Sequence, residues 1–432
     1  MKTIVRRNGL EENDYDDEFG QLHPILQRVY RNRSIRSSTD LDRELKTLFS
    51  YQQFAQIEKA VSRLAHAVMN QEKLLVIGDF DVDGATSTAL AVSALRSFGA
   101  TSVEFLVPNR FTYGYGLTPN IVDVAKAREP NVIITVDNGI ASLAGVDRAN
   151  EHGMDVIITD HHLPGNELPK AHAIVNPNQA GCQFPSKHLA GVGVIFYVMC
   201  ALRSALKEKQ WFAEQNIDCP NMANYLDLVA LGTVADVVKL DKNNRVLVHQ
   251  GIQRMRAGLV RPGIVALMQV AGRDIKRLVS SDLGFIVGPR LNAAGRLDDM
   301  TLGITCLLAE SISEALPMAS ELDQLNRERR AIETQMQSEA FELIDQLHLS
   351  EQLPLGVCLY DETWHQGVVG LVASRVKEKC HRPVIAFAKT DDNELKGSAR
   401  SVSGVHIRNV LEGVATAHPN LVSKFGGHAM AA

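Results

Sequence analysis

Three aspartates at alternating positions directly follow a short apolar run early in this chain. The run at 74–77 is typical of a buried strand, and Asp79, Asp81 and Asp83 come next. In an extended chain, alternate side chains point to the same side, so the three carboxylates would lie together. Like charges held that close repel one another unless cations or protons neutralise them. The segment therefore predicts a metal site.

A calcium-binding EF-hand loop is the first alternative, because it also begins Asp-x-Asp-x-Asp-Gly. Such a loop needs a bidentate glutamate at its twelfth position, which is Leu90 here. The segment before the motif also reads as a strand rather than a helix. A purely structural turn is the second alternative, but a turn requires one aspartate and not three. We therefore favour a metal site at a strand end.

Two further strand-like runs end in residues of the same kind. The run at 131–136 ends in Asp137, and the run at 155–159 ends in Asp160 followed by His161 and His162. A single buried histidine is usually a core residue, but an Asp-His-His run beside other acidic strand ends favours metal binding. Asp236, which ends the apolar stretch 225–235, is one more acid and would be unremarkable alone.

Helical spacing at 85–98 and 141–152 separates these runs, so the order is strand, helix, strand, helix. Helical crossovers join parallel strands, and their carboxyl ends then lie along one edge of the sheet, where open α/β sheets bind ligands. We therefore expect Asp79, Asp137 and His161 to converge.

Composition excludes several classes of protein. The chain has 432 residues, of which 45% are hydrophobic and 22% charged, enough for two or more globular domains. Its longest apolar run, at 191–202, is too short to span a bilayer, and no apolar region follows the charged N-terminus as in a signal peptide. The six cysteines form no Cys-x-x-Cys pair, which indicates reduced thiols. We expect a cytoplasmic protein without membrane contact.

The net charge of −5 does not suggest that the protein coats nucleic acid by bulk electrostatics. Local groups of arginines matter more. Three groups could contact phosphates, although for the first two a solvated surface is at least as good an explanation as DNA contact. In the third, each arginine is expected in a loop with glycine or proline, where backbone can approach a phosphate. The groups are Arg28, Arg31, Arg33 and Arg36; Arg254, Arg256 and Arg261; and Arg110, Arg290 and Arg296.

Four parts are expected along the chain. Residues 1–70 would form an arm and a helical segment, with helical spacing at 41–69, and residues 71–311 the strand-helix domain. Residues 312–348, rich in Glu, Gln, Arg, Leu and Ala, predict a long connecting helix. In the fourth part, 349–432, we expect strands near 355–360 and 383–388, a helix near 367–379, and site loops at 365–367, 374–375, 397–401 and 426–428.

The motifs together resemble the DHH phosphoesterase superfamily. Asp-x-Asp-x-Asp-Gly at 79–84, Asp-Asn-Gly at 137–139, Asp-His-His at 160–162 and Gly-Thr-Val-Ala-Asp at 232–236 occur in the order of that superfamily. Gly-Pro-Arg-Leu-Asn-Ala-Ala-Gly-Arg at 288–296 and the final Gly-Gly-His at 426–428 resemble its RecJ-type bacterial exonucleases. The resemblance extends over roughly residues 45–432.

This resemblance implies an α/β fold in which a parallel-sheet DHH phosphoesterase domain at 71–311 is joined by the long helix to a smaller, incomplete α/β DHH-associated domain at 349–432. It implies an enzyme that hydrolyses phosphodiester bonds of single-stranded DNA from the 5′ end, in DNA repair and recombination. The implied partners are single-stranded DNA, a single-strand-binding protein and a helicase, with the chain acting as a monomer.

The implied metal centre holds two divalent cations bridged by Asp137, one activating water and the other neutralising the leaving oxygen. Its oxygen-rich donor set without thiolates suits hard cations; the histidines favour Mn²⁺, and Mg²⁺ is the alternative. The sequence does not assign each ligand to one ion. The seven implied ligands are Asp79, Asp81, Asp83, Asp137, His161, His162 and Asp236.

Other residues carry implied roles at the scissile phosphate and along the strand. Asp137, His161, Arg290, Asn292 and Arg296 would act at the reacting phosphate, while Arg110 and the aromatic residues beside it would receive the 5′ end. The implied substrate-binding residues are Arg110, Tyr113, His365, Ser374, Arg375, Arg400, Gly426, Gly427 and His428.

Two other functions stay open. Small-molecule members of the superfamily hydrolyse pyrophosphate, cyclic dinucleotides or very short oligonucleotides, but the segment at 288–296 favours a polymer substrate. A catalytically inactive relative serves as a scaffold in the eukaryotic replicative helicase, but here every implied ligand is present.

The C-terminus departs from the RecJ-type pattern. In those relatives, a further helix of the second domain and an oligonucleotide-binding barrel follow the Gly-Gly-His motif. We therefore expect a C-terminally truncated chain without the barrel, which keeps the metal site but binds DNA poorly. We also expect exposed apolar surface and a tendency to aggregate or to be partly disordered after about residue 350.

Overall fold

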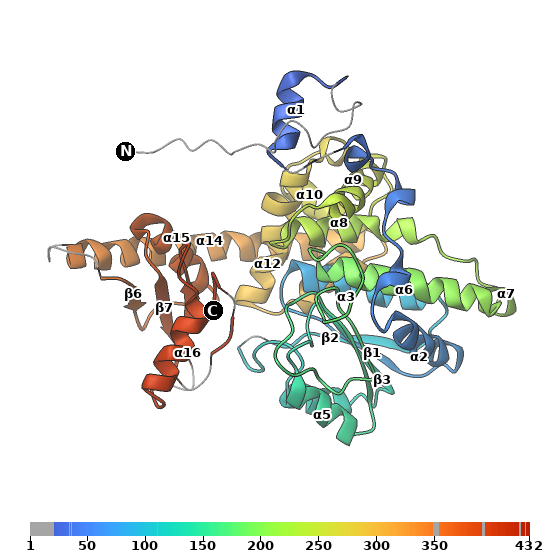
Figure 1. Cartoon of the computed structure of the whole chain (residues 1–432), viewed down its shortest axis with the longest axis horizontal. Coiled ribbons are helices and arrows are strands. Elements are labelled where there is room, and N and C mark those ends of the chain that lie inside the picture. Colours follow the sequence, from blue (N-terminus) through green and yellow to red (C-terminus); the bar gives the residue numbers. More distant parts are fainter. Residues whose placement is uncertain are drawn as a thin grey trace. The chain divides into compact units, whose positions relative to one another are not determined.

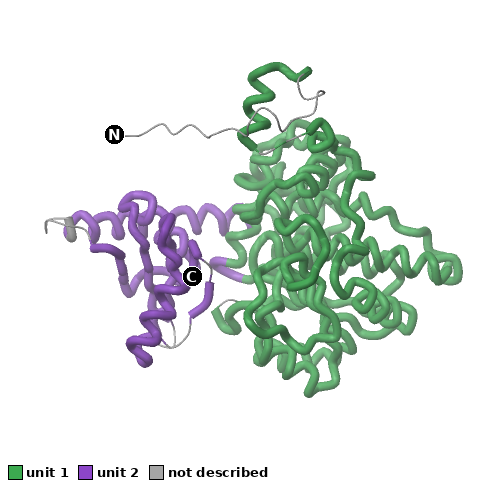
Figure 2. The backbone as a smooth tube through the Cα atoms, in the orientation of Figure 1, with its two compact units in different colours: residues 1–295, 299–320 green, residues 296–298, 321–432 purple. Residues whose placement is uncertain are grey.

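The computed structural model describes residues 21–33, 35, 37–109, 111–348, 354–390, 394–422, 425–427 and 429–432. The chain forms two compact units, which Figure 2 shows in different colours. The first comprises 1–295 and 299–320, and the second comprises 296–298 and 321–432. The long helix α14 (Ile312–His348) has the bounds expected from composition, and the division between the units falls within it.

The first unit is built on a five-stranded parallel sheet with the strand order β2-β1-β3-β4-β5 (Figure 1). The apolar runs predicted as strands form β1, β3 and β4, which are neighbours in the sheet. Their carboxyl ends therefore meet at one edge, as the crossover argument predicts. The strands are β1 (Leu74–Ile77), β2 (Val103–Leu106), β3 (Val132–Val136), β4 (Asp155–Thr159) and β5 (Ala173–Val175).

Helices cover both faces of this sheet. Apolar residues of α4 and α5 pack against Leu75, Ile77 and Ile133 in one core, while α2, α3 and α6 contact the strands from the other side. Burial on both faces explains why the strands are continuous apolar runs rather than alternating ones. These helices are α2 (Ile57–Met69), α3 (Val82–Ser97), α4 (Pro119–Lys126), α5 (Leu143–Glu151) and α6 (Gly191–Glu208).

The other described elements of the first unit are helical. Helix α8 packs against α3, α6 and α9, and a π-helical turn, η8 (Leu283–Val287), leads into α12. The remaining α-helices here are α1 (Pro24–Arg31), α7 (Trp211–Glu214), α8 (Leu226–Ala235), α9 (Lys242–Arg256), α10 (Pro262–Val270), α11 (Ser280–Asp282), α12 (Gly288–Leu297) and α13 (Thr301–Leu308). The 3-10 turns are η3 (Ser38–Leu41), η4 (Leu45–Thr47), η5 (Tyr51–Gln53), η6 (Met222–Tyr225) and η7 (Ile275–Arg277).

The helical segment expected at 41–69 is only partly correct. An α-helix begins at Ile57, whereas η4 and η5 occupy the preceding residues. Gln56 has a φ of 59°, a left-handed conformation that a continuous right-handed helix cannot contain. The apolar spacing before this residue therefore reflects contacts made by short turns.

The second unit has a three-stranded sheet of order β6-β7-β8, in which β6 and β7 are parallel and β8 is antiparallel. One face packs on α15 and on the later part of α14. The described residues of this unit include exposed apolar side chains, among them Leu355, Leu395 and Leu421. The elements are β6 (Val357–Tyr360), α15 (Val369–Cys380), β7 (Val384–Lys389), β8 (Leu395–Arg400) and α16 (Ile407–Ala417).

Two of the expected site loops of the second unit belong to regular elements instead. Ser374 and Arg375 lie within α15, and Gly397 to Arg400 lie on β8. Strand β8 pairs with β7 along its length, so the small residues in it allow close packing rather than a turn. Among the described residues, no helix has the length and apolar character needed to cross a membrane.

Candidate metal centre

The three aspartates of the first motif do not lie on one side of an extended chain. Strand β1 ends at Ile77, and Asp81 is already the N-cap of α3, because its Oδ1 accepts the amide of Gly84 at 3.0 Å. Asp83 follows in the first turn of that helix. The expectation from alternation is thus wrong, and the change from strand to helix turns Asp83 away from Asp79 and Asp81.

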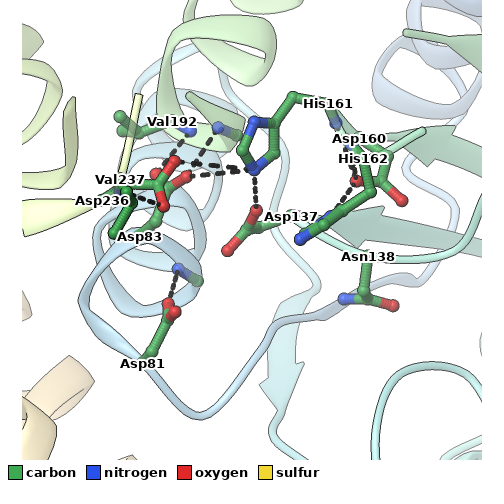
Figure 3. Close-up of polar contacts among 12 residues, drawn as sticks. Asp81, Asp83, Asp137, Asn138, Asp160, His161, His162, Val192, Asp236 and Val237 are labelled. Carbon is green, nitrogen blue, oxygen red and sulfur yellow. Dashed lines mark hydrogen bonds and ion pairs between the residues drawn. The ribbon is translucent and has the colours of Figure 1, made fainter. Parts of the chain in front are cut away.

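Acidic and histidine side chains from four elements nevertheless meet at the sheet edge (Figure 3). Asp137 follows β3, His161 and His162 follow β4, and Asp236 is the C-cap of α8. Within the described residues, three groups place their donor atoms within 4.8 Å of one another. They are Asp79, Asp81 and Asp137; Asp83, His161 and Asp236; and Asp137, His161 and His162.

The structure divides the expected ligands into groups, which the sequence alone did not do. Asp137 belongs with Asp79 and Asp81 on one side and with the histidines on the other. The Nε2 atom of His161 lies 3.1 Å from Oδ1 of Asp137, 3.7 Å from Oδ2 of Asp236 and 3.9 Å from Oδ2 of Asp83. Asp137 is therefore the carboxylate that two of the three groups share.

The buried carboxylates of this centre would be stabilised by a bound cation. Burial, and then the neighbouring carboxylates, raise the pKa of Asp83 and of Asp137 well above the ordinary value, and burial raises the pKa of Asp236. Oδ1 of Asp137 and Oδ2 of Asp236 are buried, and apart from the nearby ring nitrogen of His161 no hydrogen-bond donor reaches them among the described residues. Buried, unsatisfied oxygens in an oxygen-rich set fit hard divalent cations such as Mn²⁺ or Mg²⁺.

Asp160 organises the two histidines. Its Oδ1 accepts the amides of His161 at 2.7 Å and His162 at 3.1 Å, while Oδ2 accepts the amide of Ile140 at 2.9 Å. Nδ1 of His162 lies 2.7 Å from the same Oδ1. Burial opposes both charges, but this contact raises the pKa of His162 to about 9 and lowers the pKa of Asp160. His162 also forms a group with Asp137 and His161 whose donor atoms lie within 4.8 Å of one another.

Two asparagines that the sequence analysis did not single out hold the histidine backbone. After β5, the side-chain amide of Asn176 donates to the carbonyl of His162 at 2.9 Å, and that of Asn178 donates to the carbonyl of His161 at 2.5 Å. Asn176 is fully buried. The only signal in the sequence is an Asn-Pro-Asn run after a short apolar stretch, which reads as an ordinary turn.

Tyr115, and not the expected Tyr113, lies beside the metal centre. Tyr113 packs against the core beneath α4 and α5. The hydroxyl of Tyr115 donates to the carbonyl of Asp137 at 3.3 Å, and its ring meets that of His162 edge-on at 6.1 Å. A Tyr-Gly-Tyr-Gly loop does not reveal which of its tyrosines faces inward, because its backbone follows no regular period.

Arg290 and Arg296 lie on α12 and not in a loop, which corrects the sequence expectation. Nη1 of Arg290 donates to the carbonyl of Ile286 at 2.7 Å, and Oδ1 of Asn292 accepts the amide of Val82 at 3.2 Å. At Gly295, a Cβ atom would lie 1.8 Å from the carbonyl oxygen of Phe80, so only glycine allows this approach. Helix α12 thus supports the turn that carries the first motif.

The residues of the second unit that were expected to bind substrate have different hydrogen-bond partners. Nη1 of Arg296 donates to the carbonyl of Gly367 at 3.2 Å, and Nδ1 of His365 accepts the amide of that glycine at 3.1 Å. Ser374 donates to the carbonyl of Gly370 at 3.1 Å. These contacts bring Arg296 and His365 together at one loop, whereas the hydroxyl of Ser374 is used within its own helix.

The two arginines of this unit differ in their partners. Arg375 lies 3.3 Å from Glu333 and 3.6 Å from Glu378, so two carboxylates already neutralise it. Nη1 of Arg400 donates to neutral acceptors, the hydroxyl of Ser398 at 3.0 Å and the carbonyl of Ala399 at 2.7 Å, and burial lowers its pKa. Arg400 is therefore better suited to an anionic ligand, and Ser398 joins the candidate residues.

The other residues that were expected to contact phosphate or substrate are either not described or not part of the metal centre. Arg36, Arg110 and His428 lie outside the described residues, and Gly426 and Gly427 are exposed. The second arginine group makes structural contacts: Arg254 donates to Asn224 at 2.7 Å, Arg256 donates to the carbonyl of Leu278 at 2.7 Å, and Arg261 pairs with Asp227 at 3.3 Å.

Comparisons with known proteins identify the family of this chain. The DHH family, N-terminal domain, matches residues 73–233, and the DHHA1 domain matches 353–432. The single-stranded-DNA-specific exonuclease RecJ of Escherichia coli (strain K12) is 54% identical over 433 residues, which cover 100% of this chain and 75% of that protein. A crystal structure of exonuclease RecJ bound to manganese has 30% identity and a TM-score of 0.73, covering 89% of this chain and 90% of the other. RecJ from Thermus thermophilus in complex with Mg²⁺ has 27% identity and a TM-score of 0.70, covering 95% and 54%. With more than half of its residues identical to a relative of which it spans three quarters, this chain belongs to the RecJ family of single-stranded-DNA-specific exonucleases.

Proposed function

We propose that this chain is a metal-dependent exonuclease that hydrolyses phosphodiester bonds of single-stranded DNA from the 5′ end, in DNA repair and recombination. The observation that carries the proposal is the position of Asp137 between two groups of ligands. A shared carboxylate between adjacent sites is the arrangement used for in-line displacement at phosphorus with two ions. The relatives named single-stranded-DNA-specific exonucleases supply the substrate class.

Two of the three ligand groups would each hold one divalent cation, Mn²⁺ or Mg²⁺. Asp79, Asp81 and Asp137 would hold the first, and Asp83, His161 and Asp236 would hold the second. Asp137 would be shared, because its Oδ1 lies 3.1 Å from Nε2 of His161. When bound, such ions activate water and neutralise charge that develops on the phosphate.

The chain's own residues orient these groups and the phosphate. Asp160 and the two asparagines fix the histidines, so Nε2 of His161 faces the carboxylates. His162, charged through its contact with Asp160, would contact the phosphate. Arg290 and Arg296 would stabilise the scissile phosphate with Asn292 supporting them. A preorganised donor of this kind typically contributes about 3–4 kcal/mol to the transition state.

Further residues would hold the DNA strand itself. Arg400 and Ser398 offer a charged and a neutral donor to a backbone phosphate, and His365, Gly426, Gly427 and His428 would contribute further contacts. Arg110 would receive a 5′-phosphate. Tyr113 and Tyr115 are the aromatic residues for the terminal base, and Tyr115 is favoured because it lies against His162.

We propose that the enzyme acts in the cytoplasm as a monomer and cooperates with a single-strand-binding protein and a helicase. A basis for these partners is the need of a single-strand-specific enzyme for unwound DNA.

One experiment separates the proposal from its alternatives. Wild-type protein is incubated with Mn²⁺ and 5′-labelled single-stranded DNA, 3′-labelled single-stranded DNA, duplex DNA, pyrophosphate or a cyclic dinucleotide. We expect mononucleotide release from the 5′ label at once, slow loss of the 3′ label, and little turnover of the other substrates. Hydrolysis of pyrophosphate or cyclic dinucleotide at rates above that of DNA would overturn the proposal, as would no hydrolysis of any substrate.

A further inference from the structure

Helix α6 begins beside the metal centre without a capping side chain of its own. Its N-cap is Ala190, which offers no hydrogen-bond acceptor in its side chain. Instead, Oδ2 of Asp83 accepts the amide of Gly191 at 2.6 Å, and Oδ1 accepts the amide of Val192 at 2.9 Å (Figure 3). Asp83 on α3 therefore caps α6 from a distant part of the sequence, and the positive end of α6 partly neutralises this carboxylate.

Asp83 is also confined from the side of α8. A Cβ atom at Gly232 would lie 3.0 Å from Oδ1 of Asp83 and 2.3 Å from Oγ1 of Thr86. Both carboxylate oxygens of Asp83 are thus fixed between two helices, and the side chain is 1% exposed. Its Oδ2 also lies 3.9 Å from Nε2 of His161, and Asp83 forms one ligand group with His161 and Asp236.

The opposite side of Gly191 faces Asp137. A Cβ atom at Gly191 would lie 2.6 Å from both Cβ and Oδ1 of Asp137 and 2.8 Å from its Cγ. Asp137 cannot easily retreat, because its backbone is left-handed, with a φ of 61°. Its amide also donates to the carbonyl of Thr159 at 3.0 Å, and its carbonyl accepts Tyr115 at 3.3 Å. The side chain of Asp137 thus occupies the space that any residue larger than glycine would need.

We propose that Gly191 is a positioning residue of the metal centre: its amide fixes Asp83, and its missing side chain leaves the space in which Asp137 faces both ligand groups. One glycine thereby sets the separation between the shared carboxylate and a carboxylate of the second group. The inference deepens the proposed function and rests on it, since it concerns the cations on which that reaction depends.

The first test compares Gly191→Ala with Gly193→Ala. Both substitutions are in the first turns of α6, so both favour the helix equally. At position 193, however, a Cβ atom would meet the flexible side chain of Leu189 and no expected ligand. Mn²⁺ binding is measured by calorimetry on the full chain without DNA, together with the increase in melting temperature on adding Mn²⁺.

We expect Gly191→Ala to weaken Mn²⁺ binding at least tenfold and to lose most of the Mn²⁺-induced increase in melting temperature. Gly193→Ala should bind Mn²⁺ within twofold of wild type. If Gly191→Ala also binds within twofold of wild type, the inference is overturned. Because neither readout uses DNA, an absence of nuclease activity in the wild type would contradict the proposed function without affecting this result.

A second test remains informative if Gly191→Ala folds poorly. Glycine is favoured at the left-handed position 137, so Asp137→Gly removes the colliding side chain without straining the backbone. In a double-mutant cycle of metal-free stability, Gly191→Ala should lower the melting temperature in the wild-type background. In the Asp137→Gly background, Gly191→Ala should leave the melting temperature unchanged or raise it. Equal decreases in the two backgrounds would show that the alanine does not act on Asp137.

Discussion

Nδ1 of His162 lies 2.7 Å from Oδ1 of Asp160, and the two groups stabilise each other's charged forms. The pKa of His162 is raised to about 9, above an ordinary value near 6.5. A histidine whose pKa is higher in the folded than in the unfolded protein stabilises the fold fully below about pH 6.5. This contribution is lost as the pH rises through about 9.

We therefore expect His162→Gln to lower the free energy of unfolding of the metal-free protein by on the order of 1 kcal/mol at pH 6.5, and by less at pH 9. The measurement is urea denaturation in the presence of chelator at several pH values. His418→Gln, at the exposed end of α16, serves as the control and should show no such trend. A difference between wild type and His162→Gln that grows with pH would contradict the assignment.

Asp137→Ala should abolish nuclease activity, because both ligand groups lose their common carboxylate. We expect a loss of several orders of magnitude in kcat at saturating Mn²⁺, and reversible inactivation of the wild type by chelator. Asp123→Ala, which removes a surface carboxylate paired with Arg148, should retain wild-type rates. If Asp137→Ala kept a tenth of wild-type turnover, the bridging role would be wrong.

Asn178→Ala should disturb the metal centre through His161. The lost amide leaves the histidine carbonyl without its 2.5 Å partner, so the ring is expected to sample other orientations. We predict Mn²⁺ binding several-fold weaker and a lower kcat, with about 1 kcal/mol lost in stability. Asn150→Ala is the matched control, because its amide also donates to a carbonyl, that of Lys170 at 3.0 Å, on the surface. Identical Mn²⁺ affinities for both variants would reject the positioning role.

Arg400→Ala and Arg375→Ala should differ in DNA binding although both arginines were expected to contact substrate. Arg375 is already paired with two glutamates, whereas the acceptors that the described residues offer to Arg400 are neutral. We predict that Arg400→Ala weakens single-strand affinity about tenfold and reduces the salt dependence by about one phosphate contact. Arg375→Ala should change affinity by less than about twofold. Fluorescence anisotropy at several salt concentrations without divalent metal provides the measurement, and equal effects would refute the distinction.

The regular parts of this chain follow from local patterns. Fully buried strands such as β3 are continuous apolar runs, and α14 is rich in strong helix formers, so both could be located from sequence. The motif residues at the strand ends converge because parallel connections leave no other edge for them. Their individual roles as ligands stay predictions.

Tertiary contacts decided the features that the sequence did not reveal. Helix α12 contains Gly288, Pro289 and Gly295, which normally indicate a loop, yet it forms because it packs closely on Phe80. The hydrogen bonds from Asn178 to His161 and from Gly191 to Asp83 join segments far apart in the chain. The periodic spacing of apolar residues gives no information on such pairs, so they are seen only in the folded structure.

The Asn138-Gly139 pair beside the shared carboxylate has a consequence for chemical ageing. In flexible chains, the amide nitrogen of such a glycine attacks the asparagine side chain, and the product is an isoaspartate that lengthens the backbone. Here the side-chain amide of Asn138 is buried and donates to the carbonyls of Ile77 at 3.1 Å and Val136 at 2.9 Å, so it cannot rotate into the reactive geometry. Each unfolding event removes that protection, and the resulting lesion would shift Asp137 permanently. The rate of this reaction is therefore expected to follow how often the edge of β1 and β3 opens.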